Sequence, residues 1–398
     1  MDYITVAEAA RRWGVTARLV QGYCARGRVD GAEKFSGSWR IPVDAPKPRD
    51  LRCGGSATDR GQGAASASMG GLMPLMNTPF APGGARAAVE GLADGARRDI
   101  ARAELAYFTG LADEALAAAE PHLGSEDLGV RLSANLICAY ANLPLGRIDR
   151  ARGALEAVRG AVAEASERDP RLRAAEGFVA QAASVLLHLP APDPVPEARE
   201  VMPLLPPGLR AFAFYVQAHA AYLSGDHARS LGVAETALLG MGDVYPIPAI
   251  YLHLVAVMSD MALRRADEAR AHLLAAWELA RPDGLIEPLA EHHGLLGGML
   301  EAAIKPAWPD DFRRIIDITY RFSAGWRRVH NPATGDDVAD NLTTTEFATC
   351  MLAARGWSNA EIAAHMGISP NTVKSYVSAA LRKLGITRRR DLSRFMLS

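Results

Sequence analysis

The sequence has few cysteines and few lysines, and several motifs of enzymes are missing from it. Its four cysteines, Cys24, Cys53, Cys138 and Cys350, stand singly, without the spacing of a zinc site or a disulfide framework. None of its five lysines stands in G-x-x-x-x-G-K-[ST], which excludes a P-loop ATPase. No G-x-S-x-G occurs, and no G-x-G-x-x-G follows a strand-like run. We therefore predict a protein that is not an enzyme and that needs neither metal nor cofactor.

Long apolar runs are also missing. None approaches the roughly 18 residues of a transmembrane helix, and the amino end, MDYITVAEAARRWG, has no basic leader or apolar signal core. With 49% hydrophobic residues and a net charge of −1, the 398 residues predict a cytoplasmic protein of two or three domains with a substantial core and no membrane partner.

The balanced net charge hides an uneven distribution. Residues 1–52 hold ten Lys and Arg against six Asp and Glu, and residues 342–398 hold eight against three. The remaining middle holds 26 against 36, so both ends are basic and the centre is acidic. Basic ends suit nucleic acid, and the acidic middle suggests the hypothesis that it shields a basic end when no effector is bound.

Residues 342–398 are predicted to form four short helices. Thr343 with Glu346, and Ser358 with Glu361, have the spacing of capping boxes that open two helices. Gly356 is expected to end the first, Gly367 marks a tight turn, and Ser369 followed by Pro370 opens a third helix that runs to Gly385. Thr387 is expected to cap the fourth. Two helices joined by a short glycine-containing turn form a helix-turn-helix unit.

The third helix has two different faces. Val373, Val377, Leu381 and Leu384 follow a helical repeat and should be buried. The opposite face carries Asn371, Ser375, Ser378 and Arg382, with Lys374 on one flank and Thr372 and Lys383 on the other. Small and amide side chains can approach base edges, and Arg or Lys can reach phosphates. A solvated helix of an ordinary bundle has the same pattern.

The order of residues resembles the LuxR-type helix-turn-helix. The matching motifs are L-T-x-x-E at Leu342, S-N-x-E-I-A at Ser358 and I-S-x-x-T-V-K-x-x-V-S-x-x-x-x-K-L-G at Ile368. The resemblance implies a bacterial transcription regulator whose third helix enters the major groove of double-stranded DNA. The implied contacts include Ser369 at the start of this helix and Thr372, Lys374, Ser375, Ser378 and Lys383 along it. It also implies a homodimer contact through Leu392 with Phe395 or Met396.

Residues 1–50 are predicted to be a second DNA-binding module. Thr5 and Glu8 form a capping box, Thr16 caps a second helix to about Arg26, and Gly37-Ser38 forms a turn between two short strands ended by Pro42. This winged plan is similar to MerR-like and excisionase-like modules, in Val6 to Thr16 and Gly37 to Pro42. The resemblance implies that Thr16, Arg18 and Gln21 enter the major groove while Lys34, Ser38 and Arg40 follow the backbone. A structural remnant without DNA binding is the alternative.

Residues 51–85 are expected to be a flexible linker, although the apolar run Leu72 to Met76 could dock on the central domain. Residues 331–341 are a second expected linker. Between them, residues 86–330 are Ala-rich and contain a loose repeat. In each of four units a turn residue is followed five positions later by a small residue: Gly110 by Ala115, Gly146 by Ala151, Gly225 by Ser230 and Arg264 by Ala269. A degenerate unit is placed at Asp193 to Ala198. With aromatics at Tyr107, Tyr140 and Tyr222, this region is similar to tetratricopeptide (TPR) repeats and implies an α-solenoid. A non-repetitive helical bundle is the alternative.

The sequence therefore predicts a mainly α protein with DNA-binding modules at both ends and a helical sensor or docking domain between them. RNA polymerase or a protein, peptide or small-molecule effector is the expected partner of the middle. Two other functions remain open: an architectural or recombination-directionality protein, and a TPR-like adaptor with vestigial DNA modules.

Overall fold

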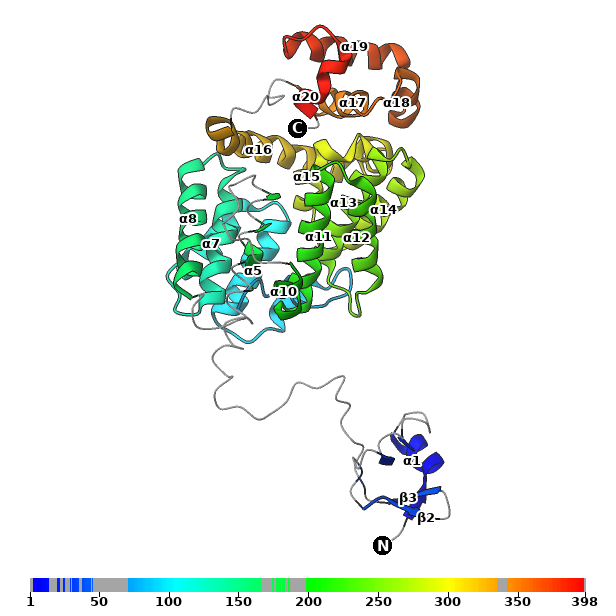
Figure 1. Ribbon diagram of the computed structural model, residues 1–398. Coiled ribbons are helices and arrows are strands. Elements are labelled where there is room, and N and C mark those ends of the chain that lie inside the picture. The colour runs from blue at the N-terminus through cyan, green and yellow to red at the C-terminus, as the bar shows by residue number, and fades with distance from the viewer. Residues whose placement is uncertain are drawn as a thin grey trace. The chain divides into compact units, whose positions relative to one another are not determined.

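The computed structural model describes residues 3–13, 20–21, 24–25, 29, 31–35, 38–43, 45, 71–165, 174, 177–179, 181–182, 185–186, 198–334 and 342–396. The chain forms two compact units, Met1–Gly61 and Gln62–Ser398. Both are shown in Figure 1, and most of the described residues are helical.

The first unit combines helix α1 (Val6–Trp13) with a three-stranded antiparallel sheet. The strands are β1 (Tyr3–Thr5), β2 (Glu33–Phe35) and β3 (Ser38–Pro42), in the order β1-β3-β2. The Thr5–Glu8 capping box is confirmed, because the Glu8 carboxylate accepts from the Thr5 N–H at 2.8 Å. Strand β1 was not predicted. Ser38, predicted in the turn, instead pairs with Phe35 as the first residue of β3.

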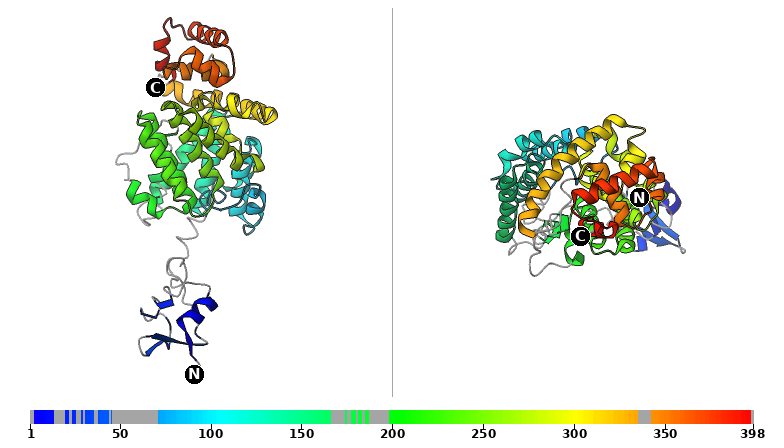
Figure 2. Two further views of the ribbon diagram at one scale, coloured as in Figure 1. Left: turned by 90° about the vertical axis from the view of Figure 1, so that its right-hand side faces the viewer. Right: turned by 90° about the horizontal axis from the view of Figure 1, so that it is seen from above.

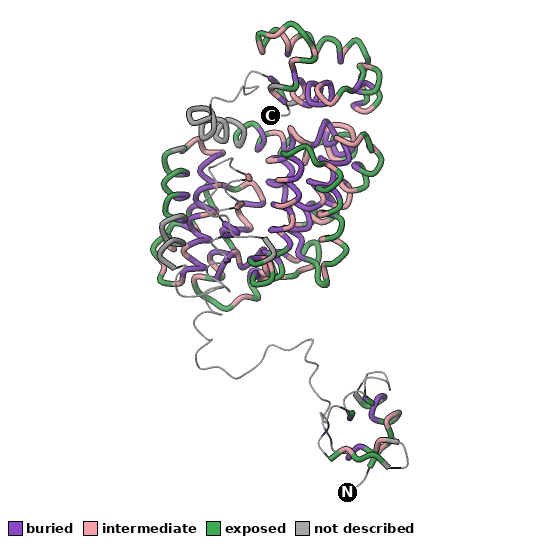
Figure 3. Tube along the Cα trace, in the orientation of Figure 1, coloured by how far each residue is buried: buried purple, intermediate pink, exposed green. Residues whose placement is uncertain are grey.

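Four helical hairpins stand out among the described residues of the second unit. They are α5 (Ala96–Phe108) with α6 (Ala112–Ala119), α7 (Leu128–Asn142) with α8 (Ile148–Ala165), α11 (Pro207–Leu223) with α12 (His227–Leu239), and α13 (Pro246–Ala262) with α14 (Ala266–Ala280). The hairpins from α5 to α8 form one half of this array, and those from α11 to α14 form the other. Within each half, successive hairpins pack side by side (Figure 1). Buried residues gather where the hairpins face one another (Figure 3).

The predicted repeat positions are confirmed as the reversal points of these hairpins. The four turn residues have φ values of +82° at Gly110, +68° at Gly146, +81° at Gly225 and +62° at Arg264. A positive φ is easy for glycine and costly for arginine. The four small residues that follow, Ala115, Ala151, Ser230 and Ala269, are all fully buried, which lets the paired helices approach closely. Of the predicted degenerate unit, only Ala198, which begins α10 (Ala198–Val201), lies within the described residues.

The apolar run after the first predicted linker docks on the helical unit, as the sequence suggested. Leu72, Leu75 and Met76 are buried, and the N–H groups of Leu75 and Met76 donate to the Glu104 carboxyl group at 2.8 and 3.0 Å. The side chain of Asn77 accepts from the Leu209 N–H at 2.8 Å. The run therefore joins α5 to α11, and the expected linker 51–85 extends too far, because residues from 71 onward belong to the folded unit.

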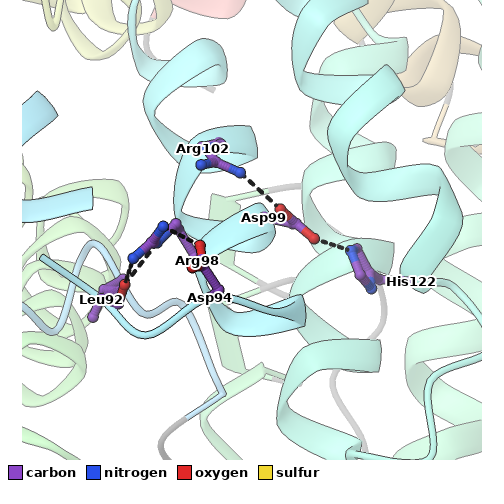
Figure 4. Close-up of polar contacts among 6 residues, drawn as sticks. All are labelled: Leu92, Asp94, Arg98, Asp99, Arg102 and His122. Atoms are coloured by element: carbon purple, nitrogen blue, oxygen red, sulfur yellow. Dashed lines mark hydrogen bonds and ion pairs between the residues drawn. The ribbon is translucent and has the colours of Figure 1, made fainter. Parts of the chain in front are cut away.

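Shorter elements flank and connect these hairpins. They are α4 (Ala85–Glu90), η2 (Glu120–His122), η3 (Met202–Leu204), η4 (Arg281–Asp283), α15 (Glu287–His292), η5 (His293–Leu296) and the π-helix η6 (Leu300–Ile304). Figure 4 shows how polar contacts hold the start of α5: Arg98 donates to the Leu92 carbonyl and pairs with Asp94, and Asp99 contacts both Arg102 and His122.

A long helix, α16 (Pro309–Thr334), crosses the ends of the hairpins (Figure 2). It packs against α15 and also contacts α8, so it connects the two halves of the hairpin array. The sequence placed a linker at 331–341, but α16 continues through Thr334 and overlaps it. After it come α17 (Thr344–Ala354), α18 (Asn359–Met366), α19 (Pro370–Lys383), η7 (Arg389–Leu392) and α20 (Ser393–Met396).

Candidate nucleic-acid interface

The caps that position α17, α18 and α19 are those that the sequence predicted. The Thr343–Glu346 and Ser358–Glu361 pairs both form complete capping boxes. Helix α18 ends at Gly367, whose φ is +66°, and the Ser369 hydroxyl then accepts from the Thr372 N–H at 3.1 Å with Pro370 as the first helical residue. These local bonds satisfy N–H groups that a helix start leaves unpaired. They place α19 directly after a tight turn.

The inner face of α19 packs on α17 and α18. Val373 and Ala380 are fully buried and Val377 nearly so. Leu381 and Leu384, which the sequence placed in the same buried row, are only half-buried at its edge. The row is thus centred on Val373, Val377 and Ala380, and α19 is held by its apolar side.

The opposite face of α19 is exposed and carries most of the predicted DNA-contacting residues. Their positions are Asn371, Lys374, Ser375, Ser378, Arg382 and Lys383. Thr372 is half-buried, and its hydroxyl is hydrogen-bonded to that of Ser369 at 2.8 Å. The structure therefore brings the predicted side chains together on one solvent-facing surface, with Ser369 serving as the cap at its start.

Lys383 is tied to the body of the module. Its ammonium group lies 2.7 Å from Oε2 of the buried Glu346, which is also part of the capping box. Burial works to raise the pKa of Glu346, but the hydrogen bond from Lys383 and those from Thr343 outweigh it, so the pKa is lowered. Lys383 therefore anchors α19 to α17, and its charge is partly neutralised.

Two residues of the predicted dimer contact are buried within the chain itself, and the contact stays a prediction. Leu392 is fully buried and Met396 is 5% exposed, because η7 and α20 pack against α17 within the same chain. Phe395 alone of the three is half-buried. The predicted cap at Thr387 is also wrong: η7 begins at Arg389, preceded by Arg388, so the fourth helix is two short turns.

In the first unit, Lys34 and Arg40 are exposed on the hairpin, and Gln21 is exposed in a helical segment. Ser38 lies in β3. Thr16 and Arg18 fall outside the described residues, so only part of the predicted contact set can be placed.

Helices α17 and α18 dock on the central helices through a set of residues that sequence reasoning missed. We call residues 293–298 the docking segment. Arg355, which follows the last residue of α17, donates to the Leu295 carbonyl at 3.2 Å and to the Tyr222 hydroxyl, and Nε2 of His365 in α18 lies 3.0 Å from the Gly297 carbonyl. Arg264, the arginine at a hairpin reversal, donates to the Gly356 carbonyl at 2.6 Å. The positive φ of Arg264 marks it as unusual for a residue other than glycine, but a backbone angle cannot be read from the sequence.

The outward face of α19 gives no support to the hypothesis that the acidic middle shields a basic end, which stays a prediction. The central helices contact α17 and α18, whereas the outward residues of α19 remain exposed.

In the described part of the chain, no helix is long and apolar enough to cross a membrane. Among the same residues, no group of three or more His, Cys, Asp or Glu side chains could hold a metal ion. No curated protein and no solved structure matches the chain. Residues 340–396 match the family of bacterial regulatory proteins known as the luxR family (GerE), so the last helices are a LuxR-type helix-turn-helix domain, whose presence suggests a DNA-binding transcription regulator.

Proposed function

We propose that the protein is a sequence-specific transcription regulator that places α19 in the major groove of double-stranded DNA. The observation that supports this most strongly is the exposed outer face of α19, on a helix whose inner face and first turn are fixed. In a helix-turn-helix, the second helix of the motif reads base edges and the surrounding residues hold the backbone. Asn371 near the start of α19 can make a bidentate contact with adenine, and Lys374 and Arg382 can reach phosphates.

The roles of the other parts are also proposals. The four hairpins, with their left-handed turn residues and buried small residues, support a TPR-like array that binds an effector or RNA polymerase. The sheet and α1 of the first unit, with exposed Lys34 and Arg40, support a MerR-like or excisionase-like module that contacts DNA. Binding as a dimer on two half-sites stays a prediction. Leu392 and Met396 do not add to it, because both are buried within the chain.

Selection of bound sequences from random DNA with the full chain tests this proposal. We expect one enriched motif, and we expect Asn371→Ala to relax the preference at one base pair at a cost of about 1–3 kcal/mol. Thr236→Ala, on an exposed position of α12, is the matched control and should leave the motif unchanged. If the full chain enriches no motif, or if the charge reversals Lys374→Glu and Arg382→Glu together leave binding intact, the proposal is wrong.

A further inference from the structure

Aromatic side chains from four helices of the hairpin array converge on α15. Tyr107 of α5 lies 6.3 Å from Tyr140 of α7, measured between ring centroids. Tyr215 of α11 lies 4.9 Å from Tyr251 of α13. We call these four residues, with Glu287, Glu291 and His292 of α15, the tyrosine–glutamate cluster. Because its members come from both halves of the array, the fold and not a local motif assembles it.

Glu291 is the polar centre of this cluster. Its carboxylate accepts hydrogen bonds from the hydroxyl groups of Tyr107 and Tyr251, the latter at 2.8 Å. Burial raises the pKa of Glu291 to about 7, and only these two hydroxyl groups act in the opposite direction. The carboxylate therefore lies among aromatic rings and hydroxyl groups, and no cation of the described residues acts on its pKa.

His292 does not supply such a cation. Its Nδ1 lies 2.8 Å from the Pro288 carbonyl and its Nε2 lies 2.8 Å from the Tyr215 hydroxyl. A carbonyl only accepts, so Nδ1 carries the proton and Nε2 accepts from Tyr215, which is the pattern of a neutral imidazole. Burial lowers the pKa of His292 to about 4, in agreement with this assignment.

Glu287 adds a second carboxyl group that is incompletely satisfied. It is 2% exposed, and its Oε1 has no hydrogen-bond partner among the residues that the structure describes. Burial raises its pKa well above the usual range, the charge of Glu291 raises it further, and Arg321 lowers it. Its charge also contributes to the raised pKa of Tyr107, so Glu287 faces the same cluster. A buried, unpaired carboxyl oxygen is costly unless something else binds it.

The cluster is not sealed from solvent. Glu291 and Tyr140 are half-buried, and so is Phe212, whose ring lies 5.1 Å from those of both Tyr215 and Tyr251. The other members are nearly or fully buried. Glu291, at the centre of the cluster, thus keeps part of its surface in contact with solvent.

We propose that the tyrosine–glutamate cluster binds the ammonium group of an organic amine. Tyrosine faces attract a cation by about 0.5–2 kcal/mol each, depending on solvation, and carboxylates supply the opposite charge. The carboxyl groups can give up a proton and pair with an ammonium group, whereas an anion finds no opposite charge on Glu287 or Glu291 and a neutral apolar molecule leaves Oε1 of Glu287 unsatisfied. A primary amine with an apolar body satisfies both the carboxyl groups and the rings.

The position of the cluster gives this site a route to the DNA-binding domain. Helix α15 continues directly into the docking segment, which contacts α17 and α18 through the Leu295 and Gly297 carbonyls. An amine held by Glu287 and Glu291 thus acts on the same stretch of chain that seats the helix-turn-helix. This consequence rests on the proposed function, whereas amine binding itself does not.

Calorimetric titration of the full chain, without DNA, tests the binding site. The probes are the ammonium ions of phenethylamine, cyclohexylamine and butylamine, with phenethyl alcohol as the uncharged analogue of the first. We expect at least one amine to bind and the alcohol to bind at least about tenfold more weakly than its amine. Absence of binding by all three amines at millimolar concentration, or equal binding of amine and alcohol, overturns the proposal.

Substitutions locate the binding. Glu291→Gln, which keeps an acceptor for the tyrosine hydroxyls, should weaken amine binding at least about tenfold. The control Glu278→Gln changes an exposed glutamate of α14 and should leave binding unaltered. Because Glu291→Gln could disturb folding, circular dichroism checks the helix content, and Glu287→Gln provides a second variant. Unchanged amine affinity in a folded variant of both glutamates contradicts the assignment.

The pH dependence gives a readout that a merely structural cluster lacks. Among the described residues, the titratable groups facing Glu291 are Tyr107 of α5, Tyr140 of α7, Tyr215 of α11, Tyr251 of α13, and Glu287 and His292 of α15, while Arg321 of α16 acts on Glu287. The raised tyrosine pKa values and the lowered pKa of His292 keep those groups neutral near pH 7. Amine binding should therefore release protons from the glutamates alone, and affinity should rise between about pH 6 and 8. Binding that is independent of pH would count against a role for the carboxyl groups.

Discussion

Truncating Leu75 to alanine should destabilise the helical unit strongly, although Leu75 lies outside the hairpins. Its side chain is fully buried, and its N–H is held by Glu104 of α5. The substitution removes about three methylene equivalents, which at ~0.8 kcal/mol each amounts to about 2.4 kcal/mol. The cavity that remains adds to this, so we expect a total loss of about 2–5 kcal/mol.

Urea unfolding followed by circular dichroism measures this loss, as the shift in midpoint multiplied by the slope. Leu239→Ala is a matched control: the same chemical change at a leucine that is 89% exposed, at the end of α12, should alter stability by no more than about 0.5 kcal/mol. If Leu75→Ala behaves like Leu239→Ala, the run from Leu72 to Met76 does not belong to the core and our account of that segment is wrong.

Two further predictions concern Glu104 and Arg264. Burial raises the pKa of Glu104 to about 8, although the N–H groups of Leu75 and Met76 act to lower it. The protonated group therefore contributes fully to the stability of the folded protein below about pH 4.5, and this contribution is lost as the pH rises to about 8. Over that range the free energy of unfolding of wild type should therefore fall by up to about 5 kcal/mol relative to that of Glu104→Gln. In the variant the amide NH₂ opposes one of the two backbone N–H groups, but this cost does not depend on pH. The prediction is wrong if the free energies of unfolding of the two proteins, measured by urea at several pH values, differ by a constant amount. Arg264→Gly should loosen the docking of α17 and α18 without weakening the α13–α14 hairpin, because it removes the bond to the Gly356 carbonyl while glycine adopts a positive φ more easily. Hydrogen exchange of the two regions measures both effects, and unchanged exchange in α17 and α18 would argue against this contact.

Local features were predictable from the sequence because they depend on neighbouring residues. The capping boxes at Thr343 and Ser358 and the cap at Ser369 involve partners three residues away. The hairpin turns at Gly110 and Arg264 were located by a repeated spacing, even though one of them lacks glycine.

Features that depend on distant contacts were missed or misplaced. The burial of Leu392 follows from packing on α17, and nothing near Leu392 in the sequence indicates whether that apolar surface meets its own chain or a second copy. The docking through Arg355 joins residues 60 positions apart at Leu295 and 133 apart at Tyr222. The tyrosine–glutamate cluster likewise appears only when α5, α7, α11, α13 and α15 are assembled.

The most direct test of the central claim, that the outer face of α19 contacts DNA, is the salt dependence of binding to the selected motif. Fluorescence anisotropy at several salt concentrations gives the slope of log K against log salt for wild type, for Arg382→Ala and for the control Arg313→Ala, whose side chain is 72% exposed on α16. If Arg382 neutralises one phosphate, its removal should weaken binding and make the slope shallower by about 0.9, while Arg313→Ala should change neither. An unaltered slope and affinity for Arg382→Ala would contradict the placement of this face against the DNA backbone.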